Sequence, residues 1–146
     1  MHLLECLPLE SFLLDRLPKW LFLLKKSTIN IMSNLSDKKC IPCHDKSIRP
    51  LSSEKVSELL TEVRGWSIVP GGQKIEKEWI VKDFVTAVRF LNEITDVAEE
   101  EGHHPDILIE NFNHVKVMFY THNVGGLTEN DFIMAAKVDK LFLWNR

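Results

Sequence analysis

The sequence of 146 residues has only three cysteines, no apolar run long enough to cross a bilayer and no surplus of basic charge. Three unevenly spaced cysteines are too few for a disulfide framework, so reduced thiols in an intracellular compartment are expected. A membrane-spanning helix needs roughly 18–20 consecutive apolar residues. The formal net charge of −3 argues against nucleic acid, because that partner selects for basic surfaces. We therefore expect neither a membrane nor a nucleic acid as a direct partner.

Several common catalytic signatures are also missing. The chain has no GxGxxG or P-loop lysine pattern for nucleotides, no GxSxG for a serine nucleophile and no HExxH for zinc. What it has is an ordinary globular composition, with 45% hydrophobic and 27% charged residues. At roughly 100–200 residues per domain, the length predicts one folded domain with a short appendage.

The first 31 residues differ from the rest of the chain. They are rich in leucine, are broken by Pro8 and Pro18, and carry three acidic residues but one arginine. This pattern fits neither a secretory signal nor a mitochondrial transit peptide. Because a polar segment follows Met32, we expect translation to start there, with a degenerate targeting peptide as the alternative. Residues 1–50 are thus expected to be a poorly ordered extension, and the protein to be cytoplasmic, or mitochondrial if the extension targets it.

The pattern of residues 51–146 predicts the element order α-β-β-α-β-β-α. Ser52 and Asp83 are suitable N-caps for the first two helices, and Gly102 is suited to ending the second. A capping-box-like start at residues 128–131 predicts the last helix. Strands are expected over residues 66–69, 75–81, 107–112 and 114–122. Paired strands between helices predict an α+β fold, a four-stranded antiparallel sheet with three helices on one face.

Two details of this pattern are testable in the structure. The second helix is expected to bury a stripe formed by Phe84, Ala87, Val88, Leu91, Ile94 and Ala98. It ends in three glutamates, residues 99–101, where the helix dipole disfavours negative charge, which hints that they serve another purpose. A tight turn is expected at Asn113.

Three histidines lie where predicted elements meet. His103 and His104 follow Gly102, and His122 is expected to end the fourth strand. Catalytic groups concentrate at such positions, and imidazole exchanges protons near neutral pH. Surface or capping histidines are the alternative reading. A catalytic zinc is a further alternative, although adjacent side chains such as those of His103 and His104 diverge in extended chain.

Cys40 and Cys43 form a CxxC pattern followed by His44. The spacing matches a c-type haem attachment pattern, half of a zinc ribbon or a redox pair. No second CxxC completes a ribbon. Two reduced cysteines in a loop are the simplest reading, followed by a clamp for the N-terminal arm or a redox-labile pair.

Three sequence elements in the second half of the chain form a specific combination. They are EGHHPD at residues 101–106, Thr-His at 121–122 and GLTENDF at 126–132. On these elements the chain resembles the pterin-4a-carbinolamine dehydratase family from Leu51 to Leu141, and its segment 40–50 resembles plant-type members. Gly102 stands where the family often has Asp or Asn. The resemblance implies a four-stranded antiparallel sheet with three helices, in agreement with the predicted order.

The resemblance also implies a reaction. A 4a-hydroxytetrahydropterin would lose water to give the quinonoid dihydropterin, which a reductase returns to tetrahydropterin after aromatic amino acid hydroxylation. The hydroxyl leaves more easily when protonated, and the N5 proton must be removed. Imidazoles can supply one acid and one base, each contributing about 10²–10⁴-fold, and no metal or redox cofactor is needed.

The matching motifs imply the residues of the site. The catalytic cluster would be His103, His104 and His122, and the pterin pocket would be lined by Pro105, Thr121, Asn123 and Val124. Trp66 and Asp131 are further candidates, with core packing and helix capping as their alternative roles.

A non-catalytic binding or assembly module is the second functional hypothesis. It rests on the resemblance alone, since animal members of the family also act as dimerisation partners of a homeodomain transcription factor. An apolar helix face left exposed in the monomer would favour it. The same face could instead join copies of this chain, and a homo-oligomer, dimer or tetramer, is expected.

Overall fold

The computed structural model of the chain describes residues 34–144, which lie in one compact unit spanning Ser33–Arg146. The expectations for residues 1–31 lie outside the described residues. The described elements are η1 (Asn34–Asp37), α2 (Ser53–Glu62), β1 (Ser67–Ile68), β2 (Ile75–Ile80), α3 (Phe84–Glu101), β3 (Asp106–Glu110), β4 (His114–Phe119), η2 (His122–Val124) and α4 (Glu129–Trp144).

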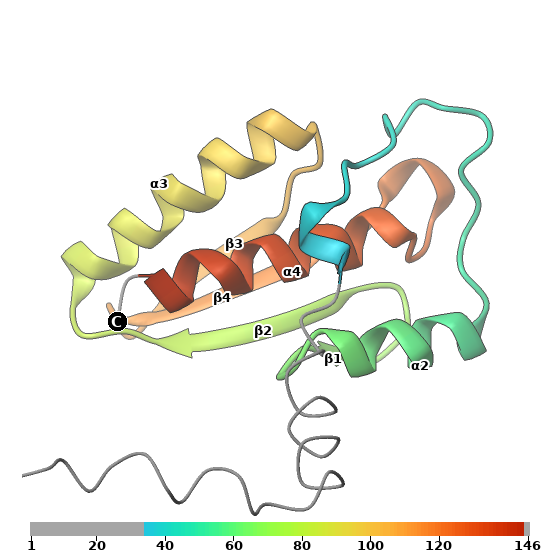
Figure 1. The fold of residues 1–146 in the computed structure, drawn as a ribbon. Helices are drawn as coiled ribbons and strands as arrows, with labels where there is room; N and C mark the ends of the chain where they lie inside the picture. Colours follow the sequence, from blue (N-terminus) through green and yellow to red (C-terminus); the bar gives the residue numbers. More distant parts are fainter. Residues whose placement is uncertain (1–33, 145–146) are drawn as a thin grey trace, which may run out of the picture. The chain divides into compact units, whose positions relative to one another are not determined.

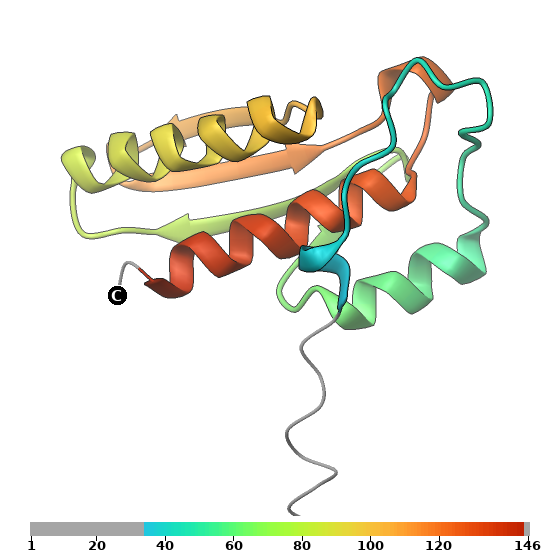
Figure 2. The same cartoon turned by 45° about the horizontal axis from the view of Figure 1, so that its top comes forward.

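The strands form one antiparallel sheet in the order β1-β2-β4-β3. Alternation along the strands gives the sheet an apolar face, since Ile75, Val115, Val117 and Phe119 are fully buried. Helices α2, α3 and α4 cover this face, as Figures 1 and 2 show. The α+β fold with three helices on one face of a four-stranded antiparallel sheet is therefore confirmed.

Helix α4 is the central helix of this layer. Phe132, Met134, Ala135 and Val138 are buried, and they point to several sides of the helix. A helix that is apolar nearly all round needs cover on every side. The sheet supplies one side, and η1 packs on another through Leu35, which is 1% exposed.

Local signals set the helix ends as expected. The side chain of Ser52 accepts a hydrogen bond from the backbone of Lys55, and that of Asp83 accepts one from Thr86. Gly102 ends α3 in the left-handed conformation, with φ of 63°. This turn directs the chain from α3 toward β3, and it places the two adjacent histidines between these elements.

The predicted buried stripe of α3 was partly wrong. Ala87, Ile94 and Ala98 are buried, but Phe90 takes the core position, and Phe84 and Val88 are 54% and 37% exposed. Apolar residues at spacings of three and four allow two overlapping stripes on this helix. The ring of Phe90 packs on that of Trp79 in the core, with 5.3 Å between the centroids, and this contact selects the stripe that contains Phe90.

Two other boundaries differ from prediction. The turn between β3 and β4 is centred on Asn111 and Phe112, both with positive φ, whereas Asn113 bonds to Val81 at the end of β2. Strand β4 ends at Phe119, so His122 does not end the strand but starts η2. Here Thr121 pairs with Gly126 in an isolated bridge instead of continuing the ladder.

Residues 34–50 belong to the folded unit, although residues 1–50 were expected to be a poorly ordered extension. Residues 38–50, here called the arm, run alongside the start of α4 (Figure 1). Asn130 and Ile41 exchange two hydrogen bonds of 2.9 and 2.7 Å. A Cβ at position 126 would lie 3.3 Å from Cβ of Pro50, so glycine permits this close approach.

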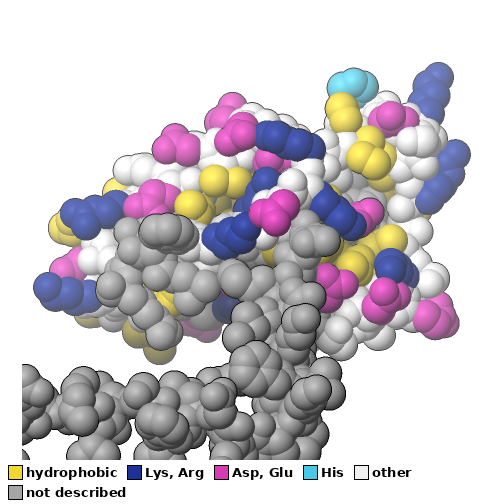
Figure 3. Space-filling model, in the orientation of Figure 1, with side chains coloured by type: hydrophobic (Ala, Val, Ile, Leu, Met, Phe, Trp, Pro, Cys, Tyr) yellow, Lys and Arg dark blue, Asp and Glu magenta, His cyan; other side chains and the backbone are white. Residues whose placement is uncertain are grey.

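Charged pairs join the outer surface of the arm to α3 and α4. Lys38 contacts Glu129 and Lys39 contacts Glu100, at 2.5 and 2.6 Å. Figure 3 shows basic and acidic side chains interspersed over this face. None of the helices in residues 34–144 has the length and apolar character needed to cross a membrane.

Candidate active site

A cleft of about 270 Å³ lies at the end of the sheet where α3, β3, η2 and the arm meet. Its volume is near the lower end of the roughly 300–1,000 Å³ typical of small-molecule sites. The residues that line it are Cys43, Gly102, His103, His104, Pro105, Asp106, Tyr120, His122 and Asn123. All three histidines singled out in the sequence therefore border one cavity.

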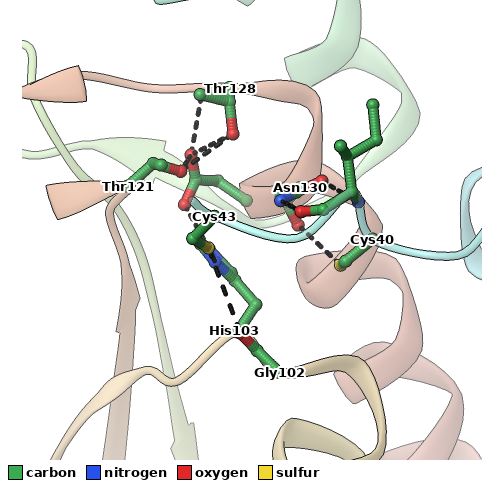
Figure 4. A network of polar contacts seen from close by, with 9 residues as sticks. Cys40, Cys43, Gly102, His103, Thr121, Thr128 and Asn130 are labelled. Carbon is green, nitrogen blue, oxygen red and sulfur yellow. Dashed lines mark hydrogen bonds and ion pairs between the residues drawn. The ribbon is translucent and has the colours of Figure 1, made fainter. Parts of the chain in front are cut away.

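His103 is held at both ring nitrogens. Its side chain is 3% exposed, and Nε2 lies 2.8 Å from Oδ1 of Asp131. On the other side of the ring, Nδ1 lies 3.2 Å from Sγ of Cys43. Figure 4 shows the sulfur of Cys43 against the ring of His103. The ring also stacks on Phe119 at 6.0 Å, so both its position and its plane are fixed.

Asp131 joins helix capping to the site. It is fully buried at the third position of α4, and its Oδ2 accepts from the backbone N–H of Thr128 at 2.7 Å, as in a capping box. The hydroxyl of Thr121 donates to the same oxygen at 2.9 Å. The carboxylate is thus satisfied by donors from the residues just before η2 and α4 and from the loop after α3, and it orients His103 from behind the cleft.

His104 lies on the open side of the cleft. Its side chain is 62% exposed, and Nε2 lies 2.8 Å from Oε1 of Glu99 on the last turn of α3. A carboxylate accepts hydrogen bonds and does not donate them, so the neutral ring carries its proton on Nε2. This arrangement leaves Nδ1 with a free lone pair.

His122 reaches the cleft from η2. It is exposed, and its ring meets the ring of Tyr120 edge to face, with centroids 4.7 Å apart. Within residues 34–144, no hydrogen bond to either ring nitrogen is present. Both nitrogens are therefore open to solvent or to a ligand in the cleft.

The two cysteines of the CxxC pattern are free thiols with different surroundings. Burial raises the pKa of Cys40 to about 12, and its Sγ contacts the carbonyl oxygen of Asn130. Burial also raises the pKa of Cys43, which borders the cleft. Both thiols are therefore protonated at neutral pH.

The three glutamates at the end of α3 each have a partner. Glu99 orients His104, and Glu100 pairs with Lys39 of the arm. Glu101 is buried, accepts from the backbone N–H of Cys40 at 2.8 Å, and lies 3.0–3.1 Å from the ammonium groups of Lys39 and Lys137. These contacts offset the unfavourable helix dipole and clamp the arm over the site.

The surroundings of Glu101 keep it ionised. Burial alone opposes ionisation, but the N–H of Cys40 and the two ammonium groups outweigh it and lower the pKa to about 2, from an ordinary 4.5. A depressed pKa in the folded state adds stability above the ordinary value. This contribution is complete near neutral pH and is lost as the pH falls from about 4.5 toward 2.

Glu101→Gln is therefore expected to lower the free energy of unfolding by roughly 1–3 kcal/mol at pH 7, because two ammonium groups and a backbone N–H lose a buried charged acceptor. The difference in the free energy of unfolding between the variant and the wild type should shrink as the pH falls from 5 to 3. Urea unfolding at a series of pH values measures it. Glu100→Gln is the matched control, since its side chain is 69% exposed. Equal stabilities of the two variants at pH 7 would contradict the clamp.

Of the other residues predicted for the site, some line the cleft and others do not. Pro105 and Asn123 line the cleft beside the histidines. Thr121 and Asp131 are 1% and 0% exposed and lie behind His103, where Asp131 contacts its ring and Thr121 contacts Asp131. Val124 follows Asn123 in η2 but is not among the lining residues. Trp66 is in the core, where it packs on Trp79 and donates to Asp139, so this geometry gives its predicted contact with a ligand no support.

Sequence reasoning missed several members of the site. Tyr120 and Asp106 line the cleft next to predicted residues, and Glu99 orients His104. The misplaced charge at the end of α3 was the signal for Glu99. The sequence marks Cys43 only as half of a CxxC pattern. Nothing local to the arm indicates that it contacts His103, which lies 60 residues later in the chain.

The described part of the chain contains no candidate metal site. No group of three or more His, Cys, Asp or Glu side chains among residues 34–144 is arranged to hold an ion. Cys43, His103 and Asp131 form a line through the imidazole ring instead of converging on one point.

Comparison with known proteins gives consistent matches. The model of the family described as pterin 4 alpha carbinolamine dehydratase matches residues 49–141. The protein of Arabidopsis thaliana named pterin-4-alpha-carbinolamine dehydratase 2, mitochondrial is 42% identical over 112 residues, which are 75% of this chain and 60% of that protein. A Halorhodospira halophila protein, provisionally named for the same enzyme, is 40% identical over 108 residues, 74% of this chain and 97% of its own.

Similarity extends to the fold of solved structures. The crystal structure of a transcriptional coactivator/pterin dehydratase from Brucella melitensis has a TM-score of 0.61 and 33% identity. The match covers 64% of this chain and 98% of that one.

Proposed function

The chain belongs to the pterin-4a-carbinolamine dehydratase family, and we propose that it removes water from a 4a-hydroxytetrahydropterin to give the quinonoid dihydropterin. Family membership supports a hydro-lyase. The observation that carries the specific proposal is the meeting of His103, His104 and His122 around one cleft. The product would then pass to a reductase that restores tetrahydropterin after aromatic amino acid hydroxylation.

The reaction needs one acid and one base. The bond from C4a to the hydroxyl oxygen breaks, and its electron pair leaves with the oxygen as water once an acid has protonated it. The N5 proton goes to a base, and the electron pair of the N–H bond forms the new double bond from N5 to C4a. The electrons balance without an oxidant or reductant, so positioned imidazoles suffice.

His104 is suited to act as the base. Glu99 keeps its proton on Nε2, which leaves the lone pair of Nδ1 available for the N5 proton. The imidazolium that forms would be stabilised by the same carboxylate. Its exposure gives it access to solvent, to which it can release the proton between turnovers.

His122 is suited to act as the acid. Its ring nitrogens have no hydrogen bond within residues 34–144, and its pairing with Tyr120 holds the ring at the cleft. In its protonated form it would donate to the departing hydroxyl. His103 lacks a free nitrogen, so in this scheme it shapes the cleft wall, with Asp131 and Thr121 supporting it, and Pro105 and Asn123 flank the pterin.

The test is direct measurement of dehydration. Ultraviolet absorbance follows the decay of chemically prepared 4a-hydroxytetrahydropterin with and without the purified protein. We expect the protein to accelerate the decay well beyond buffer and beyond an equal concentration of free imidazole. Folded protein that gives no acceleration would refute the enzymatic proposal and leave the binding or assembly module as the function to pursue.

A homo-oligomer, dimer or tetramer, is proposed on a separate observation. Phe84, Val85 and Val88 are 54%, 67% and 37% exposed, and they line a hollow of about 350 Å³ on the outer face of α3 with Arg89 and Asn92. Contiguous exposed apolar side chains commonly mark an interface. A second copy of this chain is the simplest occupant, although the same face could serve a different protein partner.

Val85→Glu is expected to shift the protein to a smaller species in sedimentation velocity, because it places a charge in the apolar face. Thr61→Glu on the exposed side of α2 should leave the distribution unchanged. A monomeric wild type at micromolar concentration would contradict the proposal.

A cytoplasmic location is proposed, with mitochondria as the alternative. The Arabidopsis relative, which is 42% identical over 112 residues, is named as mitochondrial. Expressing the chain from Met1 and from Met32 as fluorescent fusions separates the two locations. Mitochondrial signal that requires residues 1–31 would overturn the cytoplasmic proposal.

A further inference from the structure

We propose that Cys43 of the arm is a positioning residue of the active site, whose thiol fixes the protonation state of His103 by holding its Nδ1. The inference rests on the proposed dehydratase function and deepens it. It assigns a role to the second cysteine of the CxxC pattern, which the folded chain brings to a histidine 60 positions away.

The geometry defines the direction of both hydrogen bonds on the ring. Oδ1 of Asp131 lies 2.8 Å from Nε2, and a carboxylate only accepts, so Nε2 carries the proton. Nδ1 then presents a lone pair, and the thiol of Cys43, 3.2 Å away, is its donor. The other acceptor near the thiol, the carbonyl oxygen of Gly102, is farther away at 4.0 Å. Burial raises the pKa of Cys43, which keeps the donor proton in place.

The position of Cys43 is itself built from the surrounding elements. Nδ2 of Asn123 donates to its carbonyl oxygen at 2.8 Å, which ties the arm to η2 across the cleft. Asn130 holds Ile41 by two hydrogen bonds, and Glu101 holds the N–H of Cys40. Figure 4 shows the sulfur of Cys43 against the His103 ring, with Asn130 beside the arm. The contact is therefore set by three elements and not by the rotamer of one side chain.

The state of His103 matters for the proposed chemistry. When the hydroxyl leaves C4a, positive charge stays on the pterin until the N5 proton is taken. A neutral imidazole in the cleft wall does not oppose this charge, whereas an imidazolium there would. Without the thiol, Nδ1 has no hydrogen-bond donor, and a proton placed there would form a cation that the buried carboxylate of Asp131 stabilises.

Nitrogen-15 NMR of the histidine-labelled full chain tests this directly. In the wild type, Nδ1 of His103 should resonate in the unprotonated range and Nε2 in the protonated range. In Cys43→Ala, the Nδ1 signal should move toward the protonated range at pH 7. Cys43→Ser retains a donor and should restore most of the wild-type pattern. Cys40→Ala is the matched control, because that thiol contacts the carbonyl oxygen of Asn130 and no histidine.

Kinetics give the second readout. Cys43→Ala should lower kcat for dehydration roughly 10-fold with KM changed less than about threefold, which is below the ~10²-fold cost of misplacing a reacting group by about 1 Å. Cys43→Ser should recover part of the loss. His103 shifts and kcat that both stay at wild-type values in Cys43→Ala would overturn the proposal. A wild type without dehydratase activity would refute the proposed function, and the NMR shifts alone would then decide the role of Cys43.

Discussion

Replacing His104 with alanine is expected to lower kcat for dehydration by about 10²–10⁴-fold, the usual contribution of a positioned general base. The side chain is 62% exposed and its partner Glu99 is 70% exposed. Loss of an exposed pair rarely changes stability by more than about 1 kcal/mol, so the variant should fold like the wild type. Stopped-flow absorbance measures the rate, and urea unfolding verifies the fold.

The pH dependence separates the base from the acid. A base must be deprotonated to act, so the wild-type rate should rise on the acidic limb and fall on the alkaline limb. His104→Ala should abolish the acidic limb, whereas His122→Ala should abolish the alkaline one. The reverse assignment of limbs would exchange the two roles and leave the cluster intact.

His114→Ala is the matched control for this experiment. His114 is a partly buried histidine on the open face of the sheet, where its Nδ1 lies 2.7 Å from Glu78 and away from the cleft lining. Its removal should leave kcat within about twofold of the wild type. If His104→Ala were no slower than His114→Ala, the assignment of His104 would be refuted.

Asp131→Ala is expected to lower the free energy of unfolding by roughly 3–5 kcal/mol, since removing one member of a buried polar pair leaves its partners unsatisfied. Three donors lose their acceptor at once: the Nε2–H of His103, the hydroxyl of Thr121 and the N–H of Thr128. The cap of α4 is lost with them. Urea unfolding at pH 7 gives the value.

Two further variants serve as a conservative substitution and as an exposed control for Asp131→Ala. Asp131→Asn preserves the shape and one acceptor oxygen, so it should be destabilised by a smaller amount, about 1–3 kcal/mol, and it serves if the alanine variant does not fold. Asp37→Ala removes an aspartate whose side chain is 73% exposed and pairs with Lys140, and it should leave the free energy of unfolding close to the wild-type value. Similar losses for Asp131→Ala and Asp37→Ala would show that the buried network carries little stability.

Asp131 shows how much of the site could be predicted from the sequence. Asp131 was predicted both as a helix cap and as a candidate for the site, and these were treated as alternatives. In the folded chain its two oxygens do both, because Oδ2 caps α4 while Oδ1 binds His103. The capping signal is local and could be read from four residues. The second contact joins positions 28 residues apart and needed the fold.

Local signals determined most of the architecture. N-caps at Ser52 and Asp83, the left-handed Gly102 and the alternation in β4 depend on neighbours within a few residues, so they can be read from the sequence. The grouping of three histidines came from the motifs, and the fold brings them to one cleft.

Only the tertiary structure decided the rest. Two apolar stripes compete on α3, and packing against Trp79 chose the one that buries Phe90 and exposes Phe84. The position of the arm depends on partners far away in the sequence, such as Glu101 and Asn130. The sequence by itself determined the element order and marked the three histidines, because both are encoded at short range. Long-range contacts alone set the arm over that cleft and Cys43 against His103, because their free energy arises only when the chain has folded.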